Sequence, residues 1–344
     1  MTDRPIDQNL IGCAMLENRE QYFKLIKRTT DNKIDASAEA HDKVTKARCK
    51  GHPLAYVCIF ARDSVSVVDL KKAKKLLDIT VGDSPLCIDI DSSQTYAYVS
   101  NFYGNSLSVI DLKRNETIRT VAVGNRPAGL KVSRNGRYLY VVHYGEPSVY
   151  VLDIHSLKKI TEIPLPSIGL QIDISPDGAL AFVGMRATTK VAVIDLSVNL
   201  VVKIIETGAG PEDVKVSPKG RVVFVTNEDD NSITPINIQL AEPASPNIPT
   251  GGMPVGLAFT HGGKRLYCAN RQDGSVSVFK TFTHQEITKI PVGNGPYGAA
   301  STPDEKLVAV TNSWEDTLSI IDAERNVVCG TVVVGEAPGF LAII

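Results

Sequence analysis

The stretch YVSNFYGNSLSVIDL, residues 98–112, decides the fold because related stretches recur along the whole chain. Its two apolar runs, separated by a short polar loop, are typical of two β-strands joined by a turn. The residue that opens the stretch falls at positions 56, 98, 140, 182, 224, 267 and 309, a period of 42 residues with one insertion of a single residue. The chain is therefore built from seven copies of one unit.

A second motif keeps the same period and divides each unit from the next. VGDSP, VGNRP, TGAGP, TGGMP, VGNGP and VGEAP begin at residues 81, 123, 207, 250, 292 and 334, and only the fourth unit lacks a counterpart. A repeat of about 40 to 45 residues that carries four short strands is typical of a β-propeller blade. The sequence predicts an all-β fold of seven four-stranded antiparallel blades. In the third unit the strands are expected to start at Ala128, Tyr138, Ser148 and Ile160.

The ends of the repeat array predict how the ring closes. The last residues, EAPGFLAII, contain the second motif and one strand, whereas the first unit, at residue 55, starts directly with its second strand. The C-terminal strand is therefore expected to pair in the first blade, which leaves no open sheet edge. We assign residues 55–344 to the propeller and residues 1–54 to a helical or irregular N-terminal extension. Residues 20–28 have apolar positions at helical spacing.

Composition narrows the classes of partner. The 37 basic and 38 acidic residues give a net charge of -1, so neither nucleic acid nor a membrane is expected as a partner. No apolar run approaches the roughly 18 residues of a membrane span, and the acids Asp3 and Asp7 do not suit an export signal, which predicts a cytoplasmic protein. The six cysteines form no CxxC pair, so no metal site is expected. Cys58, Cys268 and Cys329 lie in apolar runs and are predicted to be packed as thiols.

The repeated residues resemble a known family. The segments YVSN, FVTN, CAN and AVTN, together with SVSVVDL, SLSVIDL, VGNRPAG, VGNGPYG and SPDG, closely resemble the YVTN-repeat β-propellers, which include YncE-like proteins. The resemblance covers residues 55–344 and implies the seven-bladed fold. That family and the propellers similar to it include surface-layer proteins, exported binding proteins, enzyme subunits and hydrolases, so the resemblance implies no single activity.

Two positions of the repeat report on the loops around one mouth of the central channel, where ligand sites tend to lie. The Asn of YVTN is expected to hold the following loop through local hydrogen bonds, and the Gly two residues after the anchor Pro lets the inner strands approach closely. The Asn position holds Asn101, Asn227, Asn270 and Asn312, but also Ile59, His143 and Met185. The Gly position holds Gly129, Gly256 and Gly298, but also Cys87, Gln171, Asp213 and Phe340.

These departures gather in blades three to five and predict a polar ligand site there. The candidate residues of this sector are His143, Gln171, Met185 and Asp213, with neighbours Tyr144, Arg186, Glu212, Glu228 and Asp229. Aromatic and cationic walls are expected from Tyr103, Arg126, Arg271, Tyr297, Trp314 and Phe340. Cys87 is either a nucleophile or a small residue that replaces Gly.

Three functions remain open from the sequence. The first is a binding module that holds a small molecule or a protein partner at the channel mouth. The second is a hydrolase or lyase of lactone-like substrates, with His143 and either Asp213 or Glu212 as acid and base and Arg186 supporting an oxyanion. The third, weaker one is a metal- or haem-dependent redox protein that uses His143 and Met185. His143 also fits a simple replacement of the lost Asn, and no cofactor is assigned.

Overall fold

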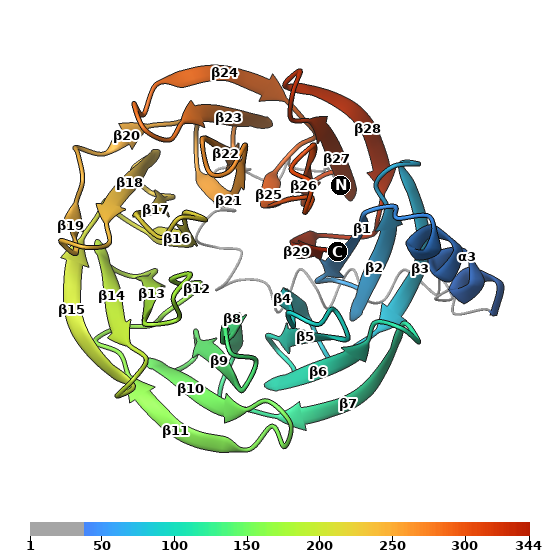
Figure 1. Cartoon of the computed structure of the whole chain (residues 1–344), viewed down its shortest axis with the longest axis horizontal. Coiled ribbons are helices and arrows are strands. Elements are labelled where there is room, and N and C mark those ends of the chain that lie inside the picture. Colours follow the sequence, from blue (N-terminus) through green and yellow to red (C-terminus); the bar gives the residue numbers. More distant parts are fainter. Residues whose placement is uncertain (1–37) are drawn as a thin grey trace, which may run out of the picture. The chain divides into compact units, whose positions relative to one another are not determined.

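The computed structural model describes residues 38–344, and these form seven antiparallel sheets arranged as blades around a central channel (Figure 1). The predicted seven-bladed propeller is confirmed. Blade 1 contains β29 (Pro338–Ile343), β1 (Leu54–Ile59), β2 (Ser64–Asp69) and β3 (Lys74–Thr80). Blade 2 contains β4 (Pro85–Ile90), β5 (Tyr96–Asn101), β6 (Ser106–Asp111) and β7 (Glu116–Ala122). Blade 3 contains β8 (Pro127–Val132), β9 (Tyr138–His143), β10 (Ser148–Asp153) and β11 (Lys159–Pro164).

The remaining blades follow the same order from the channel outward. Blade 4 contains β12 (Ile172–Ile174), β13 (Leu180–Met185), β14 (Lys190–Asp195) and β15 (Leu200–Glu206). Blade 5 contains β16 (Pro211–Val216), β17 (Val222–Asn227), β18 (Ser232–Asn237) and two short outer strands, β19 (Glu242–Pro243) and β20 (Ile248–Pro249). Blade 6 contains β21 (Pro254–Thr260), β22 (Arg265–Asn270), β23 (Ser275–Lys280) and β24 (Glu286–Pro291). Blade 7 contains β25 (Pro296–Ser301), β26 (Leu307–Asn312), β27 (Thr317–Asp322) and β28 (Val327–Val333).

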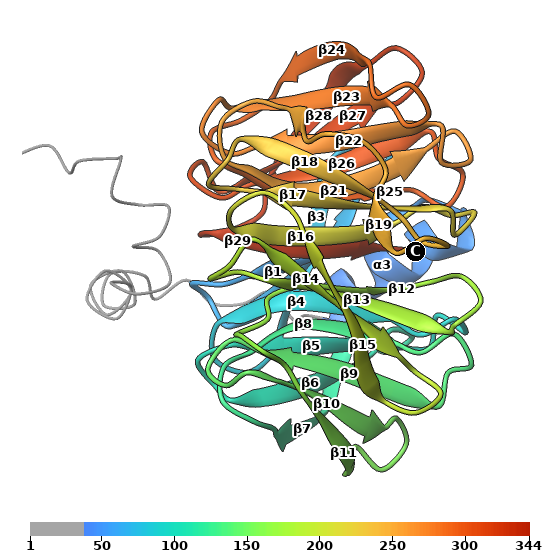
Figure 2. The same ribbon diagram turned by 90° about the vertical axis from the view of Figure 1, so that its left-hand side faces the viewer.

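The ring closes through the C-terminal strand, as the ends of the repeat array predict. Blade 1 has the order β29-β1-β2-β3, and β29 runs antiparallel to β1 with Ala55 opposite Ile343 and Val57 opposite Leu341. Leu341 is buried in the core that blades 7 and 1 share. In the side view of Figure 2 the strands cross the thickness of the ring, so their connecting loops lie on its two faces.

A single described helix, α3 (Ala38–Cys49), precedes β1. Its buried residues Ala40, Val44 and Ala47 join a core cluster that blades 1 and 2 share, and Arg48 Nη1 donates a hydrogen bond of 2.5 Å to the carbonyl of Leu112 in blade 2. The helical pattern expected over residues 20–28 lies outside the described residues. Within residues 38–344, no helix has both the length and the apolar character needed to cross a membrane.

The structure explains why Asn and a hydroxyl residue recur in the YVTN motif. Asn101 Nδ2 donates hydrogen bonds of 3.0 Å to Ser106 Oγ and 3.0 Å to Ser108 Oγ on the next strand, so its partners are side chains rather than the backbone of the loop. The preceding Ser100 donates a 2.6 Å hydrogen bond to the carbonyl of Ala128 in the adjacent blade. Asn227, with Ser232 and Thr234, and Asn312, with Thr317 and Ser319, repeat the first pattern.

The Gly position beside the channel has the close packing that was predicted. A Cβ atom on Gly298 would lie 2.9 Å from the carbonyl oxygen of Gly339 and 2.9 Å from the Cα atom of Phe340 in the neighbouring inner strand. One on Gly129 would lie 2.8 Å from the Cα atom of Gln171. Real Cβ atoms do not approach backbone this closely, so larger residues are excluded wherever the next inner strand lies so near.

The predicted burial of Cys58, Cys268 and Cys329 is only partly confirmed. Cys58 and Cys268 are fully buried thiols in β1 and β22, as the apolar runs predict. Cys329 is exposed, which corrects the prediction that it packs in the core. Its strand, β28, is the outermost strand of blade 7, where one edge has no neighbouring strand within the blade. An apolar run therefore does not ensure burial at the rim of the ring.

Candidate functional site

The residue that follows the Asn position lies at the channel mouth in each blade. In the six blades that have an anchor Pro, its backbone N–H is bonded to the carbonyl of the residue before that Pro; for example, Phe102 N lies 2.8 Å from Ser84 O, and Arg271 N lies 3.0 Å from Met253 O. Around the ring this position holds Phe60, Phe102, Tyr144, Arg186, Glu228, Arg271 and Ser313. The mouth is thus aromatic over blades 1 to 3 and charged over blades 4 to 6.

The charged half of the mouth is built on Arg186, which is only 7% exposed. Its guanidinium contacts three carboxylates: Nε lies 3.1 Å from Glu212 Oε2, Nη2 lies 2.6 Å from Glu228 Oε2, and Nη1 lies 2.8 Å from Asp229 Oδ2. Glu212 and Glu228 are each 3% exposed. Since Arg186 belongs to blade 4 and the acids to blade 5, the network joins two neighbouring blades where their loops meet.

The network continues into blades 6 and 7 through aromatic residues. Arg271 Nη1 lies 3.6 Å from Glu228 Oε1, and its guanidinium lies over the rings of Tyr297 and Trp314, at 5.1 and 5.3 Å from their centroids. The hydroxyl of Tyr297 donates a 3.1 Å hydrogen bond to Glu212 Oε1. We call this set the mouth cluster: Arg186, Glu212, Glu228, Asp229, Arg271, Tyr297 and Trp314.

Burial changes the acid–base behaviour of the mouth cluster. Burial, together with the negative charge of Glu228, raises the pKa of Glu212 to about 8, and Arg186 and Arg271 offset only part of this rise. Burial disfavours the charge of Arg186, but the hydrogen bond to Asp229 and the charges of Glu212 and Glu228 raise its pKa further. The cluster therefore contains a carboxyl group that holds its proton near neutral pH beside a permanent cation. Such perturbed groups concentrate at functional sites.

This pKa predicts a pH dependence of stability. Folded Glu212 binds its proton more tightly than it does in the unfolded chain, where the ordinary value is 4.5 and the folded value about 8, so stability is lost as pH rises through this window. The variant Glu212→Gln has no such proton. We expect its melting temperature to rise relative to that of the unmodified protein between pH 5 and pH 9. Thermal unfolding at pH 5, 7 and 9 measures this difference, and parallel curves for the two proteins would contradict the assignment.

The opposite half of the mouth is aromatic. Phe102 lies edge-on to Tyr103 with ring centroids 5.1 Å apart, and 5.7 Å from the ring of Tyr144. Phe60 of blade 1 completes the group at 5.8 Å from Tyr103, and the guanidinium of Arg126 lies 5.6 Å from the same ring. Tyr103, Tyr144 and Arg126 thus belong to a single patch on blades 1 to 3.

His143 and Met185 lie within the blades rather than at the channel. Both side chains are fully buried. The ring of His143 packs against Tyr150 with centroids 4.2 Å apart, and burial lowers its pKa. Met185 belongs to the core that blades 3 and 4 share. His143 occupies the place that Asn101 occupies in blade 2, facing the next strand of its own blade.

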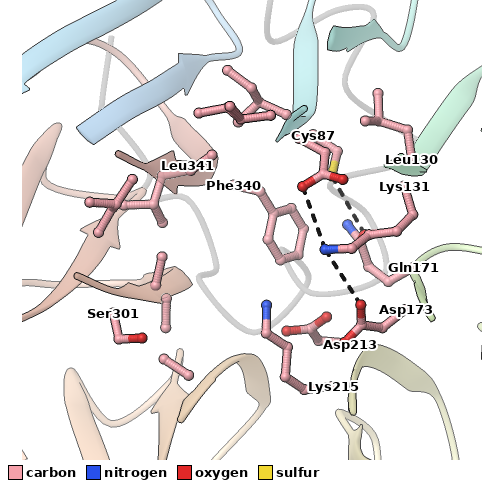
Figure 3. A pocket seen from close by; sticks show the side chains of 18 of the residues that line it. Cys87, Leu130, Lys131, Gln171, Asp173, Asp213, Lys215, Ser301, Phe340 and Leu341 are labelled. Atoms are coloured by element: carbon pink, nitrogen blue, oxygen red, sulfur yellow. Dashed lines mark hydrogen bonds and ion pairs between the residues drawn. The ribbon is translucent and has the colours of Figure 1, made fainter. Parts of the chain in front are cut away.

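A third group of predicted residues lies deeper in the channel. Cys87, Gln171, Asp213 and Phe340 line a cavity of about 340 Å³ along the inner strands (Figure 3). Both oxygens of Asp213 accept backbone N–H groups, from Val214 at 2.8 Å and from Leu257 of blade 6 at 2.9 Å. Burial raises the pKa of Asp213 to about 6, against the charge of Lys215 and these hydrogen bonds. Asp213 therefore ties two blades together, and no contact between it and His143 is found in the described part of the chain.

The cavity also contains a row of charged residues that was not predicted from the sequence. Four residues after the anchor Pro, and at the matching place in blade 4, the chain holds Asp89, Lys131, Asp173, Lys215, Ala258, Ala300 and Ala342. Lys131 Nζ lies 3.5 Å from Asp89 Oδ1 and 3.4 Å from Asp173 Oδ1. An alignment of this position across the seven repeats would have revealed charges in blades 2 to 5 and alanine in the other three.

Comparison with known proteins supports the seven-bladed propeller fold. The family model described as "Lactonase, 7-bladed beta-propeller" matches residues 208–331, and the one described as "Cytochrome D1 heme domain" matches residues 52–173. Each match covers about a third of the chain. The lactonase match includes most of the mouth cluster, and the cytochrome match includes Cys87 and Gln171. A search of curated proteins finds no match.

Solved structures are similar over most of the ring. A Kuenenia stuttgartiensis hydrazine synthase is 22% identical and covers 76% of this chain and 90% of that one, with a TM-score of 0.69. A functionally unknown protein from Desulfotomaculum acetoxidans DSM 771 is 18% identical over 84% of this chain and 98% of that one, at a TM-score of 0.74. The dihydro-haem d1 dehydrogenase NirN, in complex with DHE, is 16% identical over 81% of this chain and 63% of that one, at 0.64. These identities support the shared fold alone.

The residues of the channel do not fit ligation of a haem iron. Proteins hold haem through His, Met, Tyr or a Cys thiolate, and neither His, Met nor Tyr lines the channel cavity. Burial raises the pKa of Cys87 to about 11, which keeps its thiol protonated. Among residues 38–344 no group of three His, Cys, Asp or Glu side chains is placed to hold a metal ion. We therefore derive no chemistry through haem.

Proposed function

We propose that this protein is a ligand-binding β-propeller of the YVTN-repeat type, in which residues 55–344 form the propeller and the channel mouth takes a small polar molecule. The observation that carries the proposal is the mouth cluster: three ionisable side chains that are at least nine-tenths buried, Arg186, Glu212 and Glu228, converge at one place. A convergent group of polar side chains in the mouth of a closed β-structure is the usual form of a ligand site.

The fold itself does not require these charges. In blades 1 to 3 the same position of the repeat is filled by Phe60, Phe102 and Tyr144, which pack without buried charge. Removing ions from water is unfavourable by several kcal/mol per ion before their mutual attraction offsets it. Because the ring closes equally well on aromatic residues, the charges of blades 4 to 6 are best explained by recognition of a ligand.

The two halves of the mouth indicate what kind of ligand would bind. One side is aromatic, and the other has Arg271 over the rings of Tyr297 and Trp314, next to the carboxyl groups of Glu212 and Glu228. Trp314 is 38% exposed and is accessible to an incoming molecule. A planar or cyclic molecule with hydrogen-bonding groups at its edge matches this combination.

Trp314 is the sole tryptophan of the sequence, so its fluorescence reports directly on the mouth. We expect saturable changes in its emission on titration with a cyclic polar probe, for which we choose δ-gluconolactone, with gluconate and benzoate as comparisons. The variants Tyr297→Phe and Glu228→Gln should weaken binding about tenfold or more, since each removes a hydrogen-bonding or charged group of the cluster.

Tyr150→Phe is the matched control for this titration. It removes the same atom from a tyrosine that packs on His143 in blade 3, outside the mouth, and should leave binding unchanged. If none of the three probes changes the emission, or if all three variants respond alike, the mouth cluster is a structural ion network and the proposal fails.

A second candidate function is hydrolysis or elimination on a lactone-like substrate. It is favoured by Glu212, whose pKa of about 8 suits a general acid near neutral pH, by the cation of Arg186 at 3.1 Å from it, and by the lactonase family match over residues 208–331. Hydrolysis of δ-gluconolactone, followed by acid release, tests this function. Loss of turnover in Glu212→Gln, with the fluorescence response retained, would support hydrolysis. Binding of the lactone without turnover would contradict hydrolysis and favour the binding function.

A further inference from the structure

The lining of the channel cavity includes no residue of the mouth cluster. Its lining runs along β4 from Cys87 to Ile90 and on to Asp91, Ser92 and Gln94 in the turn that follows, which places its opening on the face opposite the mouth cluster. Phe340 lines the upper end of the cavity and packs edge-on against Tyr297 of the mouth cluster at 5.1 Å. Phe340 thus contacts both the cavity and the mouth cluster.

One wall of the cavity carries five charged side chains, and most of their hydrogen-bonding capacity is already used. Asp89 Oδ2 accepts the N–H of Val132 at 2.9 Å, and Asp173 Oδ2 accepts the N–H of Val216 at 2.9 Å. The other oxygen of each acid contacts Lys131, at 3.5 and 3.4 Å. Asp213 is bonded through both oxygens to backbone N–H groups, as described above. The carboxylates of this wall therefore join neighbouring blades to one another.

Two donors of the same wall face the cavity without such partners. Lys215 lines the cavity, and Figure 3 shows its amino group pointing into the channel; no hydrogen bond or ion pair within 4.0 Å joins it to another side chain of residues 38–344. Asp173 and Asp213 interact with it only as nearby charges. Gln171 is 4% exposed, its Oε1 is 3.6 Å from Cys87 Sγ, and its Nε2 has no hydrogen-bond partner in the described structure.

The facing wall, from blades 6, 7 and 1, is mainly apolar. Its partly exposed residues are Ala300, Ser301, Ala342 and Ile343, and it also includes the mostly buried Ala258, Phe259, Ala299 and Leu341. An apolar surface of this kind favours a hydrocarbon group, while an ammonium and an amide N–H₂ favour an anionic acceptor. The volume, about 340 Å³, is within the usual range of small-molecule sites.

We propose that the channel cavity is a second binding site, for a small organic carboxylate, with the carboxylate held by Lys215 Nζ and Gln171 Nε2 and the hydrocarbon part against the apolar wall. The site is independent of the function proposed for the mouth. It requires only that a ligand enter from the face opposite the mouth cluster, where Asp91, Ser92 and Gln94 line the cavity.

Three probes of equal chain length and different charge test the proposal: hexanoate, 1-hexanol and hexylammonium, titrated into the full-length protein by calorimetry. Hexanoate is expected to bind with a stoichiometry of one and at least tenfold more tightly than the other two. Lys215→Met keeps the length of the side chain but removes its charge, and should weaken hexanoate binding about tenfold to a hundredfold, the size of one charged hydrogen bond. Preferred binding of hexylammonium, or no binding of hexanoate, would overturn the proposal.

Two further variants keep the result interpretable. Lys289→Met removes a lysine on the outer strand β24, 4.0 Å from Glu286 and 43% exposed, and should leave hexanoate binding unchanged. Ala300→Leu adds bulk at a partly exposed alanine of the apolar wall without altering a charge and should also abolish binding; if Lys215→Met fails to fold, this variant still decides the question. A change in Trp314 emission on addition of hexanoate would place the ligand at the mouth instead and would overturn the proposal. Unchanged Trp314 emission has no bearing on the function proposed for the mouth.

Discussion

Replacing Arg186 with methionine is expected to destabilise the protein by about 3–5 kcal/mol, the range found when one partner of a buried ion pair is removed. Within residues 38–344, Arg186 is the only cation that forms an ion pair within 4.0 Å with Glu212 or Asp229, and it lies 2.6 Å from Glu228. Without it the buried carboxylate of Glu228 keeps only Arg271, 3.6 Å away, as a partner cation. Equilibrium unfolding in urea at pH 7 measures the loss directly.

A surface arginine provides the matched control. Arg62 makes an ion pair of 3.2 Å with Glu336, but the two side chains are 30% and 22% exposed, so Arg62→Met should change stability by less than about 1 kcal/mol. Replacing Glu228 with glutamine in the Arg186→Met background should restore part of the lost stability, because the unpaired charge of Glu228 is then absent. Equal losses for Arg62→Met and Arg186→Met would show that the mouth cluster is not desolvated.

Deleting residues 336–344 should abolish the cooperative fold. The deletion removes β29, exposes the edge of β1 and takes Phe340 and Leu341 out of two core clusters. Loss of a large buried apolar side chain is worth about 2–5 kcal/mol, and whole domains are stable by only about 5–15 kcal/mol. Circular dichroism and size-exclusion chromatography should show an unfolded or aggregated chain, because an unpaired edge invites association.

Removing only Ile344 is the control for this deletion. It affects the two backbone hydrogen bonds with Leu54, each 3.0 Å long, and leaves the pairing of β29 with β1 in place. We expect a folded protein with a modestly lower melting temperature. A monomeric, cooperatively unfolding product from the longer deletion would contradict the view that strand closure holds the ring together.

Much of the fold could be predicted from repeat spacing alone. The expected strand starts at Tyr138 and Ser148 in blade 3 are those observed, and the starts at Ala128 and Ile160 are within one residue of β8 and β11. Spacing succeeds here because strands and turns depend on local sequence. It was less informative where the repeat is degenerate: in blade 4, which lacks the anchor Pro, the inner strand β12 has only three residues.

The candidate site was predicted in composition but not in arrangement. Arg186, Glu212, Glu228, Arg271, Tyr297 and Trp314 were singled out from the sequence, and the structure places them in contact as one cluster. His143, although it departs from the same consensus, lies within blade 3 against Tyr150. The difference arises because the Asn position faces the next strand of its own blade, whereas the following residue faces the mouth.

By itself the sequence determined the number of blades, the strand order and the closure, since each of these follows from a repeated unit that must bury both of its faces. Only the tertiary structure decided which side chains meet. Contacts such as those of Lys131 with Asp89 and Asp173, or of Arg271 with Glu228, join residues 42 or 43 positions apart in adjacent inner strands and loops. Their lengths depend on how neighbouring blades pack around the channel, which no local pattern encodes.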